Sequence, residues 1–222
     1  MTGQGATPVA EVDEAQTVRF PQRTIDAGGS PVDIAEAGDG APLIYLGTST
    51  DTLAGLLARD FRVVALEPDS GFTALTPAMK ARRIAAVAAA LSLETYSVCA
   101  AGADTQAAAH LAADDPEKLQ RAILLAPDVF DARGVLNDPS LSEKTADIAC
   151  HSLALFGTDA GGHCEGNASH YRERLPKCHL MYVYDAPDPA RDRPDAAASV
   201  IADFLRRGEG FLVSEKDGRV HP

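Results

Sequence analysis

Residues 95–116 have the residue types of a buried strand, a tight turn and a helix rich in small side chains. A strand-to-helix turn of this kind is where a Gly-x-Ser-x-Gly segment exposes a nucleophilic serine above a parallel sheet. Here the turn, Ala100 to Asp104, reads AAGAD, and none of its side chains is a hydroxyl or a thiol. The sequence therefore predicts the frame that positions a nucleophile, without the nucleophile.

Composition limits the classes of protein to which the chain can belong. It has 222 residues and a formal charge of −12, with 45% hydrophobic and 23% charged residues. This is a globular composition with length for one well-buried α/β domain. Its acidity argues against binding nucleic acid or an anionic membrane, and no window is apolar for long enough to cross a bilayer. The N-terminus lacks the pattern of a signal or transit peptide, so we expect a cytoplasmic protein, and the Arg-rich, Ala-rich composition is typical of a GC-rich bacterial genome.

Strand and helix patterns alternate along the chain after an N-terminal hairpin at 18–26 and 31–36. Further strands are predicted at 42–46, 61–66, 95–99, 120–126, 151–156 and 179–184, and helices at 52–59, 77–91, 104–113, about 169–173 and 196–206. Such alternation predicts a mostly parallel, twisted sheet with helices on both faces. Ligands of these sheets bind at the carboxyl ends of the strands.

Four stretches resemble the α/β-hydrolase superfamily. They are APLIYLG at 41–47, DFRVVALEP at 60–68, residues 107–127, and the segment from 182 through 193–195 to 205. The resemblance implies the three-layer α/β-hydrolase fold in a single domain over 17–213, between an acidic tail at 1–16 and a C-terminal tail at 214–222. The short connection from Ala126 to His151 implies a minimal cap or none.

The positions that carry catalysis in this family depart from its pattern. The nucleophile position falls on Gly102, or on Ala100 if the register slips by two residues, and the histidine position falls on Pro187, which cannot transfer a proton. Asp159 stands where the family has its acid, and residues 46–48 replace the His-Gly of the oxyanion loop. Loss of a nucleophile or base in such a triad costs on the order of 10⁶ in turnover, so hydrolysis by the family mechanism is not expected.

The turn itself also invites a structural interpretation. In a Gly-x-Ser-x-Gly turn, called a nucleophile elbow, the serine has a strained backbone conformation. Glycine adopts positive φ without a side-chain penalty, so Gly102 relieves this strain. Asp104 is a good N-cap for a helix that starts at Thr105. We therefore expect the turn to have relaxed into an ordinary capped helix start.

Four cysteines raise the question of a metal site. Three of them adjoin a histidine, in the pairs Cys150-His151, His163-Cys164 and Cys178-His179. The paired Cys-x-x-Cys spacing of a structural zinc site is missing, and the second pair follows a strand whereas the other two precede strands. We expect free thiols and no metal or cofactor, with Cys99 packed in the core rather than acting as a nucleophile.

Other groups at the predicted rim could act in catalysis. The carboxylates there are Asp69, Asp104, Asp128, Asp159, Asp185 and Asp188. A close pair would separate into an acid and a base, but caps and solvated loops explain such residues more simply. His163 and His170 flank the loop after Phe156, where a displaced base would lie, and His110 is expected to be a packed helix residue.

These observations favour a non-catalytic α/β-hydrolase-fold protein that serves as a binding or accessory subunit of a bacterial complex, with a protein partner or self-association. One alternative is a hydrolase, lyase or isomerase that uses non-standard rim residues. The other is a small-molecule carrier that uses the backbone donors of the turn. The expected ligand-binding residues are Gly47, Thr48, Gly102, Ala103, Asp104, Asp159 and His163.

Overall fold

A computed structural model of the protein describes residues 18–67, 70–158, 163–208 and 210. The tails expected at 1–16 and 214–222 lie outside these residues.

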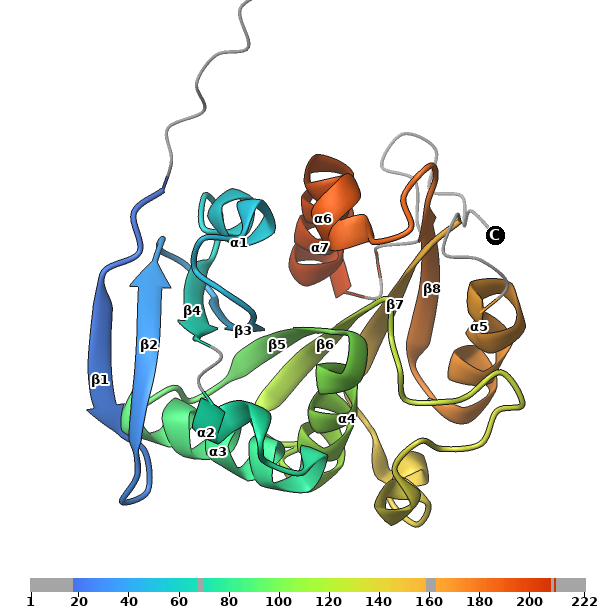
Figure 1. The fold of residues 1–222 in the computed structure, drawn as a ribbon, viewed down its shortest axis with the longest axis horizontal. Coiled ribbons are helices and arrows are strands. Elements are labelled where there is room, and N and C mark those ends of the chain that lie inside the picture. Colours follow the sequence, from blue (N-terminus) through green and yellow to red (C-terminus); the bar gives the residue numbers. More distant parts are fainter. Residues whose placement is uncertain (1–17, 68–69, 159–162, 209, 211–222) are drawn as a thin grey trace, which may run out of the picture.

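One eight-stranded sheet forms the centre of the molecule (Figure 1). Its strands are β1 (Gln22–Asp26), β2 (Pro31–Ala37), β3 (Pro42–Leu46), β4 (Arg62–Leu66), β5 (Tyr96–Ala101), β6 (Leu119–Leu125), β7 (His151–Gly157) and β8 (Cys178–Val183). They lie in the order β1-β2-β4-β3-β5-β6-β7-β8, with β1/β2 and β2/β4 antiparallel and the pairs from β4 to β8 parallel. The expected N-terminal hairpin and mostly parallel sheet are confirmed.

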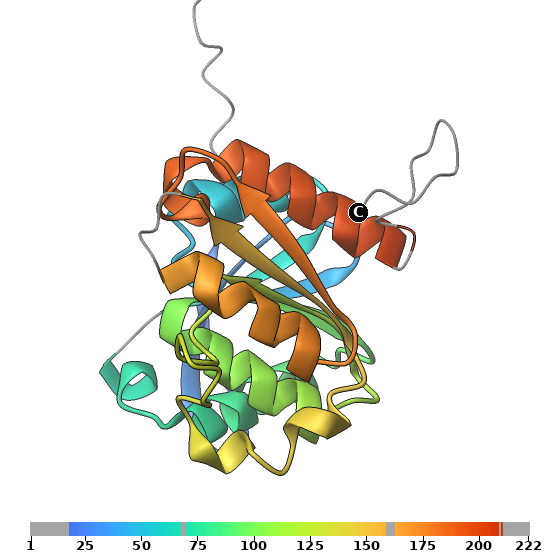
Figure 2. The ribbon, with the colours of Figure 1, turned by 90° about the vertical axis from the view of Figure 1, so that its right-hand side faces the viewer.

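Helices cover both faces of this sheet. They are α1 (Thr52–Leu57), α2 (Ser70–Thr73), α3 (Pro77–Ala90), α4 (Thr105–Asp114), α5 (His163–Arg174), α6 (Pro189–Asp192) and α7 (Pro194–Arg207). α1, α6 and α7 lie on one face, and α3, α4 and α5 lie on the other (Figures 1 and 2). The chain thus forms the three layers that strict alternation of strands and helices predicts.

The central strands are mostly apolar because both of their faces are buried. In β3, Ile44 packs towards α3 and α4 whereas Leu43 packs towards α1 and α7, and both are fully buried. α7 buries Ala197, Ile201 and Leu205, which lie four residues apart on one stripe. Alternating side chains of one strand therefore belong to two separate apolar clusters.

Three helices differ from expectation. α5 begins at His163 rather than near Ser169, and the short helices α2 and α6 were not predicted. The first turn of α5 includes Gly166 and Asn167, which are weak helix formers, so the sequence pattern underestimates its length. Ala168, Tyr171 and Leu175 pack the helix against the core, and this tertiary contact stabilises what local propensity does not.

An ion-pair cluster joins the hairpin to the parallel part of the sheet. Glu36 of β2 accepts from Arg23 of β1 at 2.8 Å and from Arg62 of β4 at 2.5 Å. Burial pulls the pKa of Glu36 upwards, but the hydrogen bonds and charges of the two arginines outweigh it and hold the pKa below its usual range. Glu36 is therefore ionised in the folded protein at neutral pH.

Replacing Glu36 tests this cluster. A carboxyl with a depressed folded pKa contributes stability above its unfolded pKa and loses it as pH falls through the folded pKa. Glu36→Gln is expected to lower the free energy of unfolding by about 0.5–1 kcal/mol at pH 7, and the difference from wild type is expected to shrink in acid. Urea unfolding at several pH values measures it, and a difference that is constant with pH would contradict the ionised pair.

Gly157, the last residue of β7, has no room for a side chain. A Cβ at this position would lie 1.7 Å from the carbonyl oxygen of Ala186, in the loop after β8. Gly157→Ala is therefore expected to destabilise the protein by about 1–3 kcal/mol, because the two segments must move apart.

Gly55 of α1 offers a matched control, because a Cβ there meets no heavy atom within 4 Å. Gly55→Ala is expected to stabilise the protein by about 0.5–1 kcal/mol through its helix propensity. Thermal or urea unfolding of both variants measures the contrast, and equal effects would contradict the close approach at Gly157.

Candidate functional site

The turn between β5 and α4 keeps the backbone of a nucleophile elbow. β5 ends at Ala101, a 3₁₀ turn covers Gly102–Asp104, and Gly102 has a φ of +55°. A Cβ built on Gly102 meets no heavy atom within 4 Å, so space for a side chain is open above the turn. Glycine adopts this φ without a side-chain penalty, as expected, so the turn carries none of the strain that a serine would have there.

Asp104 does not cap α4 with its side chain, contrary to expectation. It occupies the N-cap position, but its carboxylate pairs with Lys80 of α3, whose side chain is only 13% exposed. The Lys80 ammonium also lies 5.2 Å from the centre of the Phe72 ring. The hydroxyl of Thr105 donates to the carbonyl of Gly102 and closes the turn instead. Asp104, which was expected to cap α4, thus links the start of α4 to α3.

The loop after β3 uses its backbone donors within the protein. The Thr48 N–H donates to Asp51 Oδ2 at 3.1 Å, and the Ser49 N–H donates to Glu67 Oε1 at 2.9 Å. The Thr48 hydroxyl donates to the other Asp51 oxygen at 2.7 Å. A Cβ on Gly47 would lie 2.9 Å from Asp51 Oδ2, so glycine permits this close approach. An oxyanion at this loop would meet two carboxylates rather than free N–H groups.

The position of the family's histidine contains no proton-transfer group. Pro187 is exposed in the loop between β8 and α6, and the Asp185 N–H of this loop donates to the hydroxyl of Thr158, next to the end of β7. Asp159, the candidate acid, lies outside the described residues. His163 is the first residue of α5, and the placement of its side chain also lies outside the described part of the chain. The geometry of these two candidates therefore stays a prediction.

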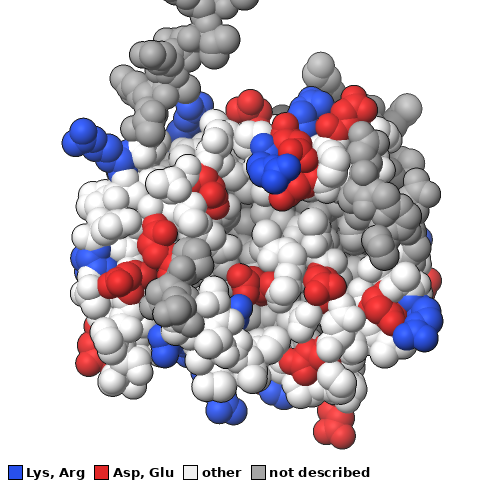
Figure 3. All heavy atoms as spheres, viewed as in Figure 1, with Lys and Arg blue, Asp and Glu red and all other residues white. Residues whose placement is uncertain are grey.

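Several rim carboxylates have structural partners. Asp188 accepts from the N–H groups of Ala190 and Arg191, which confirms a capping role at α6. Asp185 has a φ of +53°, and its N–H donates to the hydroxyl of Thr158. Figure 3 shows acidic side chains across the face seen in Figure 1, several of them around its central hollow.

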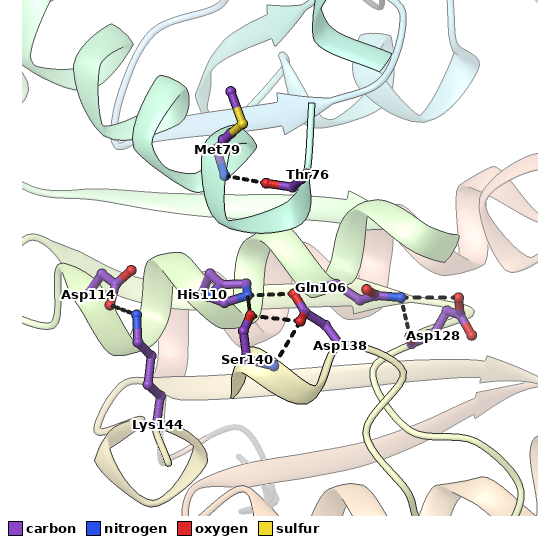
Figure 4. A network of polar contacts seen from close by, with 9 residues as sticks. All are labelled: Thr76, Met79, Gln106, His110, Asp114, Asp128, Asp138, Ser140 and Lys144. Carbon is purple, nitrogen blue, oxygen red and sulfur yellow. Dashed lines mark hydrogen bonds and ion pairs between the residues drawn. The ribbon is translucent and has the colours of Figure 1, made fainter. Parts of the chain in front are cut away.

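The segment that joins β6 to β7, residues 127–150, is fastened along α4, and we call it the strap. Gln106, His110 and Asp114 lie four residues apart on one face of α4, and all three reach the strap (Figure 4). The amide of Gln106 donates to the Asp128 carbonyl at 3.0 Å, and the Lys144 ammonium donates to Asp114 at 2.7 Å. The strap is thus tied to α4 at three successive turns of the helix.

His110 makes the central contact of this stripe. Its side chain is 1% exposed, and its Nε2 lies 2.8 Å from Asp138 Oδ2 and 3.3 Å from the hydroxyl of Ser140. Because an ionised carboxylate only accepts, Nε2 donates to Asp138. Burial pulls the pKa of Asp138 upwards, but hydrogen bonds from Ser140 and His110 hold it below its usual range. His110 is a packed helix residue, as expected, and it positions the strap.

The described cysteines are core residues. Cys99 is fully buried, and burial raises the pKa of its thiol well above the usual range, which agrees with the expected packing role. Burial also raises the pKa of Cys150 and of Cys178 to about 11. Thiols of this kind stay protonated and unreactive at neutral pH.

The pairs Cys150-His151 and Cys178-His179 lie at the starts of neighbouring strands, and their two imidazole rings stack with centres 6.0 Å apart. His163 begins α5, beyond the opposite end of β7, so the expected separation of the pairs is confirmed. Among the residues that the structure describes, no three potential ligands gather in a metal-binding group.

A cavity of about 520 Å³ opens beside the strap at the carboxyl ends of β6 and β7. Its lining residues are Ala126, Pro127, Asp128, Phe130, Asp131, Ala132, Arg133, Asn137, Phe156 and Asn167. The lining includes no residue of the turn at 100–104. The cavity is thus separate from the turn at 100–104, and one of its walls is the strap.

Sequence reasoning did not find the strap wall of this cavity or the stripe on α4. The stripe had a signal, since polar residues at 106, 110 and 114 interrupt an otherwise Ala-rich helix. Their partners lie 22 to 30 residues away along the chain, and local patterns do not identify such partners.

In the described part of the chain, no helix is long and apolar enough to cross a bilayer.

No protein-family model matches the chain, and no curated protein matches its sequence. Solved structures, in contrast, resemble it over most of its length. A predicted CIB-like hydrolase from Thermoplasma acidophilum superposes with a TM-score of 0.70 at 15% identity, covering 85% of this chain and 99% of that one.

Two further structures show the same relationship. E-2-(acetamidomethylene)succinate hydrolase superposes with a TM-score of 0.69 at 13% identity, covering 84% of this chain and 99% of its own. A serine hydrolase of carbazole degradation, the CarC enzyme, superposes with a TM-score of 0.67 at 13% identity and the same coverage of 84% and 99%. At these identities the likeness concerns architecture. The protein has the α/β-hydrolase fold.

Proposed function

We propose that this protein is a non-catalytic member of the α/β-hydrolase fold that works by binding, as an accessory subunit in a complex. The observation that carries the proposal is the glycine at the apex of an otherwise intact elbow. Gly102 has the φ of an elbow residue and open space above it, yet it offers no attacking atom. The position of the base is Pro187, so nucleophile and proton acceptor are missing together.

The oxyanion loop supports the same proposal independently. The N–H groups of Thr48 and Ser49 already donate to Asp51 and Glu67. Loss of one oxyanion donor costs about 10²–10³ in turnover in a serine hydrolase that keeps its triad. Here the donors are occupied by carboxylates, which would also repel the negative charge of a tetrahedral intermediate. The nucleophile position, the base position and the oxyanion loop therefore all differ from what acyl transfer requires, and they lie at separate places in the chain.

The proposal predicts that the purified protein does not turn over p-nitrophenyl acetate or butyrate above the buffer rate. Gly102→Ser is expected to fold, since a Cβ fits, at a cost of about 1–3 kcal/mol from its positive φ. It is expected to gain no turnover, because the position of the base is Pro187 and the N–H groups of Thr48 and Ser49 already donate to carboxylates. Continuous absorbance assays and thermal unfolding measure both.

Robust ester turnover by the wild type, lost in a variant of the rim such as Lys80→Met, would contradict the proposal and favour an enzyme that uses non-standard residues. Lys80 is the choice because it pairs with Asp104 next to the elbow.

An accessory role also predicts a stable complex. Tagged protein purified from its native host is expected to elute in size-exclusion chromatography with light scattering at a mass above the 23.2 kDa of one chain. Mass spectrometry of that peak identifies either a partner or a second copy. Elution as a lone monomer at physiological salt and protein concentration would contradict the accessory role.

A further inference from the structure

The two edge strands of the sheet, β1 and β8, have sequences of different kinds. β1 reads QRTID, contains Arg23 and Asp26 and directly follows Pro21. Charged residues and proline at an edge usually prevent it from pairing with another chain. β8 reads CHLMYV and contains no acidic residue, lysine, arginine, proline or glycine. The sequence therefore protects the edge at β1 and leaves the edge at β8 able to pair.

β8 has backbone groups that its pairing with β7 does not use. The Ser152 N–H donates to the Lys177 carbonyl at 3.0 Å. The Thr158 N–H donates to the Val183 carbonyl at 3.1 Å, so the odd-numbered residues of β8 bond to β7. Because these groups alternate in direction along a strand, those of Leu180 point away from β7. Among the described strands β7 is the only neighbour of β8, and Figure 2 looks onto this edge between α5 and α7.

The side chains along this edge are apolar and only partly covered. Leu180 and Met181 are half-buried, Tyr182 is 39% exposed, and Tyr184, just beyond the strand, is 73% exposed. Leu180 packs against the apolar cluster on the α5 side of the sheet, and Met181 packs against the cluster on the α7 side. The two tyrosines are half of the large apolar side chains that are exposed in the described part of the chain. An extended apolar edge of this kind is suited to receive another strand.

The order of residues in β8 is complementary to itself. When two copies pair antiparallel about Met181, Leu180 of one copy lies opposite Tyr182 of the other on the α5 side of the sheet. The two Met181 side chains face each other on the α7 side. Aliphatic and aromatic side chains placed opposite one another stabilise antiparallel pairs. A two-fold axis at Met181 makes the contact the same for both copies, so the assembly closes at two chains.

Two charges at the ends of β8 agree with the same arrangement. Lys177 and Asp185 lie four residues before and four residues after Met181, and both are exposed. Neither has an ion pair within the part of the chain that the structure describes. Antiparallel pairing about Met181 brings Lys177 of one copy near Asp185 of the other at both ends of the contact, whereas parallel pairing would place like charges together. The charges therefore favour an antiparallel second copy.

We propose that the partner of this protein is a second copy of the same chain, joined through antiparallel pairing of the two β8 strands about Met181. The two sheets then become one continuous sheet, and the outward backbone groups of Leu180 gain partners. The exposed tyrosines lie within or beside the contact. This inference rests on the proposed accessory role and deepens it, because it names the partner.

Sedimentation velocity of the full-length protein, expressed alone and measured over a range of concentrations, tests the pairing. The wild type is expected to approach twice the 23.2 kDa of one chain as its concentration rises. Tyr182→Lys gives β8 the kind of residue that protects natural edges, and it is expected to raise the dissociation constant of the dimer about tenfold. Gln22→Lys makes the same change of charge at an exposed position of β1, and it is expected to associate as the wild type does. Thermal unfolding verifies that each variant is folded.

An exchange of charges tests the register without altering the apolar edge. Lys177→Glu and Asp185→Lys each place like charges at both ends of the contact, so each alone is expected to weaken association about tenfold. An equimolar mixture of the two variants is expected to associate as tightly as the wild type, because both ends of the mixed dimer then join opposite charges. Pairing of two copies in this antiparallel register predicts that recovery.

A cross-link tests the contact at its centre. In an antiparallel sheet, opposite residues that do not exchange hydrogen bonds have closely spaced side chains, so Met181→Cys is expected to form a reducible link between two copies under mild oxidation by copper phenanthroline. Met79→Cys is the matched control, because Met79 is 49% exposed on α3, away from this edge. It is expected to form no more linked dimer than the wild type does.

The inference is overturned if the wild type stays a monomer at every concentration, if Tyr182→Lys associates like Gln22→Lys, or if the mixture of exchanged charges does not recover. Purification from the native host separates these results from the proposed function. A monomer that is bound there to a different protein would remove the self-pairing and leave the accessory role standing. A dimer that turns over esters would contradict the non-catalytic role and leave the self-pairing standing.

Discussion

The positive φ of Gly102 is the constraint on which the carboxyl edge of the sheet depends. It turns the chain from the end of β5 directly into α4, whose axis then runs back against β5, β6 and α3. That course presents the stripe of Gln106, His110 and Asp114 to the strap. The strap in turn supplies Phe130 and the mouth of the cavity. A flattened turn would rotate α4 and displace its three contacts with the strap.

At the same edge of the sheet, acidic side chains accept hydrogen bonds from backbone and side-chain donors of the protein. Asp51 and Glu67 accept from the N–H groups of Thr48 and Ser49, and Asp104 pairs with Lys80. Each of these carboxylates lies in or near a loop at a strand end, where desolvation is incomplete and the cost of holding a charge is modest. Some of the acidic residues of this chain therefore serve to stabilise its loops.

Sequence reasoning reached the sheet and most of the helices because their signals are local. The apolar run at 42–46 became β3 with the same bounds, and the small-residue helix after the turn became α4 within one residue at each end. The failures involve contacts between distant residues. Asp104 was assigned to a cap from its place before Thr105, but Lys80, 24 residues away, binds it instead. Likewise Thr48 gave no sign that Asp51 would occupy its N–H group, since loop conformation decides that contact.

An elbow without a nucleophile is stable for a physical reason. A serine at this φ carries strain of about 1–3 kcal/mol, which hydrolases of this fold offset elsewhere, whereas glycine carries none. With glycine at position 102 the turn takes this φ without that strain. The contacts that α4 makes with α3, β6 and the strap then keep the elbow in place without any catalytic requirement. The strap that these contacts hold also forms one wall of the cavity of about 520 Å³ at the ends of β6 and β7, so the course of α4 determines the shape of this edge of the sheet.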